Sequence, residues 1–313
     1  MPDASQADRI CVISNKGSGR SSREADAVDA AMAVLGDRAM LWRVEGRDLD
    51  DAGAQAVAEG FGAIVAAGGD GTIMSVAGAV AGAAQGAGRR FGVVPLGTFN
   101  YFARGLGIPE DPAGAAQVIL DGHARPVSLG EVNGRLFLNN VSLGVYPAIL
   151  RNREEVYRRW GRRRIAAHWS VAKTVLSLGR PLYLSLTTDG EASRVVTPLL
   201  FVARSAFQLE HFGLDGADCV AAGRMAVFVA PDTGRAGLFA TAFRLVRGST
   251  QAGRDFALAC ADEVTIAARS RHLTVACDGE KMRMRTPLRL RIHPDALEVF
   301  APPEAATKAD QAA

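Results

Sequence analysis

Two patterns of hydrophobic and polar residues divide the chain at about residue 125. Before this point, short apolar runs alternate with segments whose apolar residues recur at helical spacing. The apolar runs lie at 10–14, 39–44, 61–67 and 91–97, and the helical segments lie at 23–36, 48–60, 72–85 and 111–122. Strands that alternate with helices predict a parallel sheet covered by helices on both faces.

After Arg125 the apolar runs are separated mainly by turns. Asn133-Gly134 and Asp189-Gly190 each lie between two runs, which is the pattern of a β-hairpin, and the runs at 135–145 and 194–203 follow these turns. Further runs lie at 224–230, 263–268, 273–279 and 288–293. This half therefore predicts an antiparallel β-sandwich or barrel, which helical spacing interrupts at 148–179 and 236–247.

We expect two domains from this division. Residues 8–124 form an α/β domain, and residues 125–293 form a β-sandwich domain with the helical insertion at about 148–179. The polar end of the chain, 302–313, is predicted to be disordered.

Composition narrows the function classes only slightly. The 313 residues are 48% hydrophobic and carry a net charge of +3, which by itself does not indicate nucleic-acid binding. The four cysteines form no CxxC and no paired spacing, which favours a reducing cytosol over a disulfide framework. We find no signal-peptide pattern and no charge-free apolar stretch of about 20 residues, so a spanning helix is not expected.

The segment from Gly68 to Thr72, GGDGT, joins a predicted strand to a predicted helix. Glycines let a phosphate group approach the backbone, and the N–H groups at a helix N-terminus attract it. The acid Asp70 would hold Mg²⁺ or position a reacting hydroxyl group beside the phosphates. The alternative is a tight turn that glycine permits and Asp70 caps.

Two more loops follow predicted strands of the same sheet. Residues 15–19, NKGSG, follow the first strand, and residues 95–100, PLGTFN, follow the fourth. Parallel strands bring such ends to one edge, where open α/β sheets bind their ligands. The three loops therefore predict a phosphate-binding site whose candidate residues include Asn15, Lys16, Gly17, Gly19 and Gly97.

A fourth candidate lies far away in the sequence, at Asp278-Gly279-Glu280. It is either an ordinary hairpin turn or a pair of carboxylates presented to a substrate. In the second case Asp278 accepts the proton of an acceptor hydroxyl, and Glu280 supports a metal ion.

With these pieces the chain resembles the diacylglycerol kinase catalytic-domain family, a lipid kinase superfamily that includes sphingosine and ceramide kinases. The matching segments are NKGSG (15–19), GGDGT (68–72), PLGTFNYFARGLGIP (95–109), FLNNVSLG (137–144) and DGE (278–280). The resemblance implies an α/β domain and a β-sandwich, with ATP and Mg²⁺ in the cleft between them. It also implies that the last strand, within about 294–301, returns to the first domain.

The resemblance also implies roles for single residues. Those that would serve ATP and its metal are Asn15, Gly69, Asp70, Gly71, Thr72, Thr98 and Asn100. Asp278 and Glu280 would match the acidic pair proposed as catalytic, and we expect Asp278 to be the base, with Asp70 second. The chain departs from the family pattern at Lys16, Tyr101 and Ala222, and the last departure puts a second metal site in doubt.

A basic segment at 151–164 contains seven arginines with interleaved aromatic residues. Such a segment is typical of docking to anionic headgroups, although a solvated helix face is the alternative. The expected docking residues are Arg158, Arg159, Trp160, Arg162, Arg163 and Arg164. No known nucleic-acid motif accompanies them, so nucleic acid is not an expected partner.

The sequence thus predicts an ATP-dependent kinase that phosphorylates a hydroxyl of a diacylglycerol-like lipid. It would lie in the cytoplasm, peripherally on the inner face of the membrane. The alternatives are a kinase of a soluble acceptor such as NAD and a membrane-docked nucleotide-binding protein without turnover. The lipid acceptor and the oligomeric state, a homodimer included, stay open.

Overall fold

The computed structural model describes residues 8–16, 22–83, 90–144, 181–234, 237, 241, 244 and 253–303. The described chain divides into two compact units, which are Met1–Ser128 with Pro294–Ala313 and Leu129–His293. We call them unit 1 and unit 2. The predicted insertion at 148–179, most of the predicted helix at 236–247 and most of the predicted tail at 302–313 lie outside the described residues.

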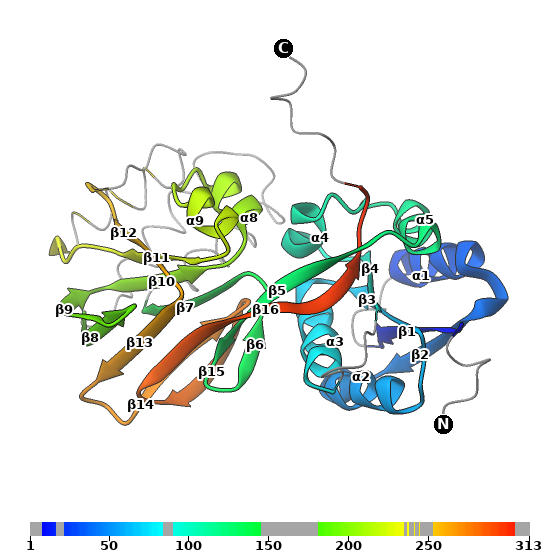
Figure 1. Cartoon of the computed structure of the whole chain (residues 1–313), viewed down its shortest axis with the longest axis horizontal. Helices are drawn as coiled ribbons and strands as arrows, with labels where there is room; N and C mark the ends of the chain where they lie inside the picture. The colour runs from blue at the N-terminus through cyan, green and yellow to red at the C-terminus, as the bar shows by residue number, and fades with distance from the viewer. Residues whose placement is uncertain are drawn as a thin grey trace, which may run out of the picture. The chain divides into compact units, whose positions relative to one another are not determined.

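Unit 1 is built around a parallel sheet of order β2-β1-β3-β4, to which the end of β16 is added beside β4 (Figure 1). Its strands are β1 (Ile10–Asn15), β2 (Ala39–Val44), β3 (Ala63–Gly68) and β4 (Arg90–Pro95). β1 and β3 are buried along almost their whole length because helices cover both faces of the sheet. The predicted α/β class is therefore confirmed for this unit.

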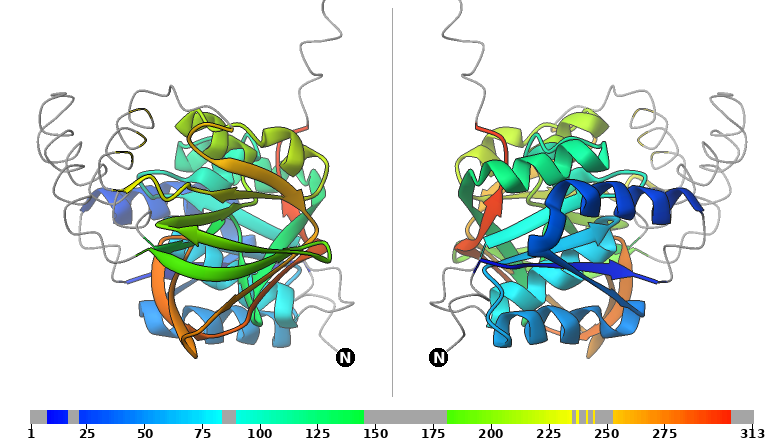
Figure 2. Two further views of the ribbon diagram at one scale, coloured as in Figure 1. Left: turned by 90° about the vertical axis from the view of Figure 1, so that its left-hand side faces the viewer. Right: turned by 90° about the vertical axis from the view of Figure 1, so that its right-hand side faces the viewer.

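The helices of unit 1 lie in two layers, with α1 and α5 on one face of the sheet and α2 and α3 on the other (Figure 2, right). They are α1 (Ser22–Leu35), α2 (Leu49–Ala58), α3 (Asp70–Ala83), α4 (Tyr101–Gly105) and α5 (Pro112–Asp121), with 3-10 turns η1 (Gly36–Arg38) and η2 (Gly46–Asp48). The ends of α5 follow the sequence signals, because the side chain of Asp111 accepts the Gly114 N–H and Gly122 adopts a left-handed conformation.

Unit 2 contains two antiparallel sheets (Figure 1). The strands of one are β5 (Ala124–Val132), β6 (Arg135–Phe137), β8 (Leu182–Thr188), β9 (Glu191–Thr197), β13 (Glu263–Ala268) and the first part of β16 (Leu288–Phe300). The strands of the other, in spatial order, are β12 (Ala257–Ala261), β11 (Met225–Val229), β10 (Leu199–Ala203), β7 (Asn140–Gly144), β14 (His272–Cys277) and β15 (Glu280–Arg285). Helices α8 (Ala206–Phe212) and α9 (Ala217–Ala221) follow β10 in the chain. The predicted sandwich class is confirmed.

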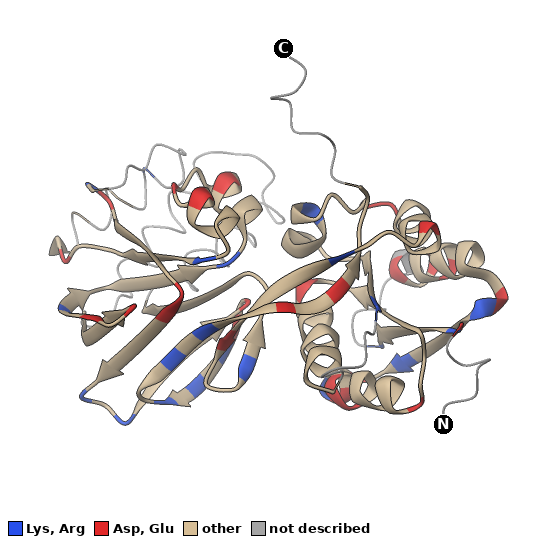
Figure 3. Ribbon diagram, in the orientation of Figure 1, with Lys and Arg blue, Asp and Glu red and all other residues tan. Residues whose placement is uncertain are grey.

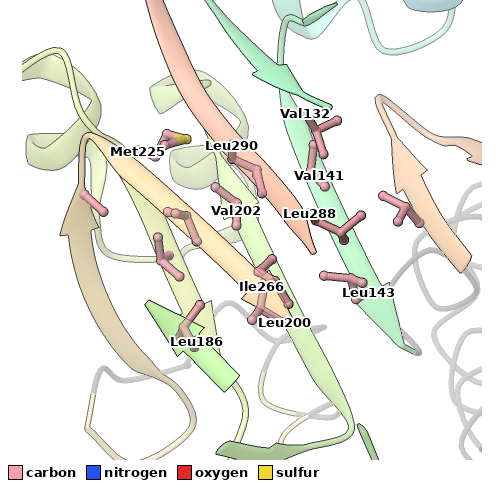
Figure 4. Close-up of a cluster of buried hydrophobic side chains, with 14 of the residues drawn as sticks. Val132, Val141, Leu143, Leu186, Leu200, Val202, Met225, Ile266, Leu288 and Leu290 are labelled. Carbon is pink, nitrogen blue, oxygen red and sulfur yellow. The ribbon is translucent and has the colours of Figure 1, made fainter. Parts of the chain in front are cut away.

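The core of unit 2 consists of apolar side chains from both sheets, among them Val141, Leu143, Leu200, Ile266 and Leu288 (Figure 4). Both predicted hairpins occur, since Val132 pairs with Arg135 and Thr188 pairs with Glu191. Successive side chains of a strand point to opposite faces of its sheet, so each strand contributes alternate residues to this core.

Three expectations need correction. The run 135–145 is not one strand. β6 ends at Phe137, β7 begins at Asn140, and the two strands belong to different sheets. The run 194–203 is likewise broken at Pro198, whose missing N–H cannot continue a ladder.

The third correction concerns the cysteines. Cys219 of α9 and Cys260 of β12 form a disulfide, with their Cα atoms 5.3 Å apart. The expectation that the cysteines do not pair is therefore wrong. The two residues are separated by 41 positions, and only the packing of α9 and β12 brings them together.

Candidate functional site

The three glycine-rich loops begin at one edge of the parallel sheet of unit 1. Ser14 is paired with Ala67, and Gly68 is paired with Pro95, so β1, β3 and β4 end side by side. Asn15 and Lys16 therefore lie next to the start of GGDGT, whereas Gly17 and Gly19 lie outside the described residues. The sheet alone brings the described parts of the three loops together.

The loops after β3 and β4 approach each other at two glycines, Gly69 and Gly97, which have no side chains. A Cβ added to Gly69 would lie 3.3 Å from the Cα of Gly97, and a Cβ added to Gly97 would lie 2.7 Å from the Cα of Gly69. The Leu96 N–H also donates to the Gly68 carbonyl at 2.9 Å. A side chain at Gly97 would therefore force the loops to shift, whereas the contact at Gly69 is tight but less severe.

Gly68 has a different local reason. A Cβ at this position would lie 2.6 Å from the Cβ of Thr72, one turn into α3. Thr72 is buried, whereas Thr98 in the next loop is exposed. The two predicted threonines therefore differ in access, and only Thr98 presents its side chain widely to solvent.

Asp70 is the first residue of α3 and faces the chain that opens α4. Its Oδ1 accepts the Phe102 N–H at 3.5 Å. Burial raises the pKa of the Asp70 carboxyl above its ordinary value, although the N–H groups of residues 100–102 and the charge of Arg104 oppose this rise. Asp70 is therefore an acid whose surroundings favour its taking up a proton.

Asn100 shapes the loop after β4. It has a φ of 49°, its Oδ1 accepts the Gly97 N–H at 3.0 Å and its Nδ2 donates to the Gly97 carbonyl at 3.0 Å. Nδ2 also contacts Glu110, which forms an ion pair with Arg104 at 2.7 Å. The buried amide thus closes the loop on itself, so its first role is to hold Gly97 against Gly69.

Asp278 lies in unit 2, at the first position of the tight turn between β14 and β15. It has a φ of 45°, which Asp tolerates in such a turn. Its Oδ2 accepts the Leu138 N–H at 2.7 Å, and its Oδ1 accepts the N–H groups of Asn139 and Asn140 at 2.8 and 2.9 Å. The carboxylate therefore holds the bend between β6 and β7 through three backbone donors.

The other acid of this turn, Glu280, forms an ion pair with Arg135 at 2.9 Å. In the described part of the chain no group of three or more His, Cys, Asp or Glu residues could hold a metal ion. A magnesium ion bound with a nucleotide needs only one or two carboxylates, because phosphates and water supply the other ligands. Asp70, beside the glycine loops, fits such a role.

Sequence reasoning assigned no role to three polar residues around Asp278. Asn139, Asn140 and Gln208 are all buried, and the Asn140 Nδ2 donates to the Gln208 Oε1 at 2.9 Å. The Asn139 Oδ1 is buried without a hydrogen-bond partner among the described residues. The adjacent asparagines in FLNNVSLG were the available signal, whereas nothing near Gln208 in sequence connected it to them.

The predicted docking residues Arg158, Arg159, Trp160, Arg162, Arg163 and Arg164 lie outside the described residues. None of the helices that the structure describes is long and apolar enough to cross a bilayer.

Comparison with known protein families gives two matches along the chain. The model of the diacylglycerol kinase catalytic domain matches residues 9–132. The model of the YegS C-terminal NAD kinase β-sandwich-like domain matches residues 140–301, which is about half of the chain.

Similar curated proteins match over shorter stretches. The chain is 48% identical over 102 residues to a Pseudomonas aeruginosa protein named "Probable lipid kinase YegS-like", which covers 32% of each chain. It is 44% identical over 86 residues to a diacylglycerol kinase of Staphylococcus aureus, which covers 27% of this chain and 26% of the relative. The matches thus span about a third or less of these relatives' length.

Among solved structures, a diacylglycerol kinase from Bacillus anthracis str. Sterne aligns with a TM-score of 0.70 at 20% identity. The alignment covers 95% of this chain and 98% of that one. At this identity the similarity shows a shared fold.

Proposed function

Because the chain belongs to the family that pairs a diacylglycerol kinase catalytic domain with a YegS C-terminal β-sandwich domain, we propose that it is an ATP-dependent lipid kinase. It transfers the γ-phosphate of ATP to a hydroxyl group of a diacylglycerol-like membrane lipid. The observation that carries the proposal is the contact of Gly69 with Gly97 beside the partly buried acid Asp70.

The ATP phosphates bind at the edge formed by the loops after β1, β3 and β4. The backbone near Gly69 and Gly97 is bare, and the N-terminus of α3 points its N–H groups toward an anion. Lys16 is exposed at the end of β1 and supplies a cation to the same edge. Positioning and neutralisation of charge account for most of the acceleration of a phosphoryl transfer.

In the transfer, the acceptor hydroxyl oxygen forms a bond to the γ-phosphorus while the bond to the β,γ-bridging oxygen breaks, and ADP leaves. The hydroxyl proton passes to a carboxylate. We assign this step to Asp70, because its carboxyl lies at the start of α3 beside the glycine loops, where the phosphates would bind.

Asp278 has a different role in the proposal. Its two oxygens already accept three backbone N–H groups, from Leu138, Asn139 and Asn140. Asp278 is therefore a positioning residue that holds the backbone of Leu138, Asn139 and Asn140. This reverses the order expected from the sequence, which placed the base at Asp278 and Asp70 second.

Mg²⁺ is the expected metal of the reaction, and Asp70 is the residue that would hold it beside the phosphates. When bound, the ion neutralises negative charge on the phosphate oxygens. Glu280, the other expected ligand, is engaged by Arg135, so we assign it to the structure of the turn.

The proposed location is the inner face of the cytoplasmic membrane, because ATP is supplied from the cytoplasm and the acceptor is held in a bilayer. A kinase acting on NAD is the second candidate, since the C-terminal family model is described as NAD kinase β-sandwich-like. This candidate requires no contact with lipid.

The test is transfer of label from γ-labelled ATP to an acceptor panel. The panel contains diacylglycerol, monoacylglycerol, sphingosine, ceramide, phosphatidylglycerol and a long-chain prenol in mixed micelles, with NAD as the soluble acceptor. We expect label in one lipid, and its loss in Asp70→Asn. Label in NAD alone would establish the second candidate, and ATP binding without transfer to any acceptor would contradict both.

A further inference from the structure

Strand β15 presents two chemically different faces. Met282 and Met284 are partly buried and pack against the core of unit 2. The residues that alternate with them, Lys281, Arg283 and Arg285, are exposed. Because successive side chains of a strand point to opposite faces, these three cations share the outer face of the sheet, and we call them the β15 basic face.

The neighbouring chain extends this positive surface. Arg285 is paired with the exposed His272 of β14, and the Thr286 N–H donates to the carbonyl of Arg271 at 3.0 Å. Arg269 and Arg271, in the turn before β14, are both exposed. Basic side chains thus continue from the strand into the adjoining turn.

The charges of this surface have no acidic partner within the described part of the chain. Lys281, Arg283 and Arg285 form no ion pair with any described Asp or Glu. Elsewhere in unit 2 the described arginines commonly meet acids, as Arg135 meets Glu280 and Arg224 meets Asp189. Figure 3 shows Lys and Arg at several positions in the part of unit 2 that contains β14 and β15.

Nearby acids are already engaged. Asp278 is held by three backbone N–H groups, and Glu280 by Arg135. Glu131 on β5 binds both Arg291 and His293. The positive surface is therefore not neutralised by the two acids of its own hairpin.

Protection of an edge strand is one reason for such charges, since β15 ends its sheet and basic residues prevent pairing with another strand. That purpose requires charges on the strand itself, whereas Arg269 and Arg271 extend them beyond it. Single-stranded nucleic acid would need aromatic side chains for stacking. The large exposed hydrophobic residues that the structure describes are Tyr183 and Val196, on β8 and β9 of the other sheet.

We infer that the β15 basic face binds the surface of an anionic bilayer, with phospholipid phosphate groups as its partners. The alternate residues of a strand lie about 6.6 Å apart, so the three cations can contact separate headgroups along one line. The inference deepens the proposed function, on which it rests for the kind of surface, because a lipid acceptor must be reached at a bilayer.

The experiment is sedimentation of the full chain with vesicles of phosphatidylcholine, with and without phosphatidylglycerol. The test variant is Lys281→Gln/Arg283→Gln/Arg285→Gln. The matched control is Arg38→Gln/Arg43→Gln/Arg194→Gln, which removes the same net charge from exposed positions on η1, β2 and β9. Each basic residue at an anionic surface contributes about fivefold to partitioning.

We expect the test variant to bind anionic vesicles on the order of 100-fold more weakly at low ionic strength. The control should stay within a few-fold of the unchanged protein, and neutral vesicles should bind neither. Equal binding by the test variant and the unchanged protein would overturn the inference, as would an equal loss in the control. Loss of oligonucleotide binding with unchanged vesicle binding would assign the surface to nucleic acid instead.

A second assay separates this inference from the proposed function. Phosphate transfer to lipid dispersed in neutral detergent micelles does not depend on an anionic bilayer, so we expect the test variant to retain it. Weakened vesicle binding without any kinase activity would leave the docking surface standing and contradict the proposed function. Normal micellar activity of the test variant with unchanged vesicle binding would contradict the docking surface and leave the proposed function standing.

Discussion

The Cα atom of Gly69 lies where a Cβ on Gly97 would come within 2.7 Å of it. The two residues belong to loops that follow different strands, β3 and β4, and they approach because those strands are adjacent and parallel. The same hypothetical Cβ would also lie 2.7 Å from the Asn100 Oδ1. The two loops are thus packed against each other through backbone, with Asp70 next to the contact.

Gly97→Ala tests this contact. The added methyl group must push the loops apart or displace Asn100, and overpacking of this kind costs about 1–3 kcal/mol of stability. We expect a lower melting temperature and weaker ATP binding, measured by thermal unfolding and nucleotide titration. Gly82→Ala is the control, because nothing lies within 4 Å of its Cβ position on α3 and alanine favours a helix. Unchanged stability and nucleotide affinity in Gly97→Ala would show that the loops do not need this approach.

Asp70→Asn tests the cost of a partly buried charge. The pKa of Asp70 is raised above its ordinary value of 3.8, so the folded protein binds a proton more readily than the unfolded chain. Its contribution to stability is therefore complete below pH 3.8 and is lost as the pH rises through the raised pKa. The Asp70→Asn variant should not show this loss of stability with rising pH. It should be at least as stable as the unchanged protein at neutral pH.

Turnover of the same variant should fall by roughly 100-fold or more, as expected for removal of a proton acceptor. Denaturant unfolding across the acid to neutral range and the lipid kinase assay measure the two effects. A variant that is less stable at neutral pH would contradict the burial effect, and near-normal turnover would remove Asp70 from the reaction.

Asp278→Asn tests the bend between β6 and β7. The amide cannot accept three N–H groups with both of its heavy atoms, so at least one donor of residues 138–140 is left without its partner. We expect a loss of roughly 1–3 kcal/mol in the free energy of unfolding. The control Asp232→Asn changes an exposed acid and should stay within about 0.5 kcal/mol. Full stability combined with loss of turnover would return the base role to Asp278.

Reduction of the Cys219–Cys260 disulfide should lower the melting temperature. The bond closes a loop of 41 residues, which in the chain-entropy description stabilises the fold by about 4 kcal/mol. Thermal unfolding with and without a thiol reductant measures the effect. The double variant Cys219→Ala/Cys260→Ala should melt lower and no longer respond to reductant. A response that persists in this variant would have to come from the buried cysteines Cys11 or Cys277.

The order of residues by itself determined the fold class, most element positions and the three glycine loops. These features are local: hydrophobic period, the Asn133-Gly134 turn and the cap at Asp111 each depend on neighbours a few positions away. Because β1, β3 and β4 are parallel and adjacent, the local signals were enough to place the described parts of the loops at one edge.

Only the tertiary structure decided what the acids and cysteines contact. Asp278 reaches the backbone of Leu138 across 140 positions, and Cys219 reaches Cys260 across 41. A turn motif such as Asp-Gly predicts the turn but not the partners of its carboxylate. The physical reason is that hydrogen bonds and disulfides depend on packing between distant segments, whereas helix, strand and turn preferences depend mainly on residues that are close in sequence.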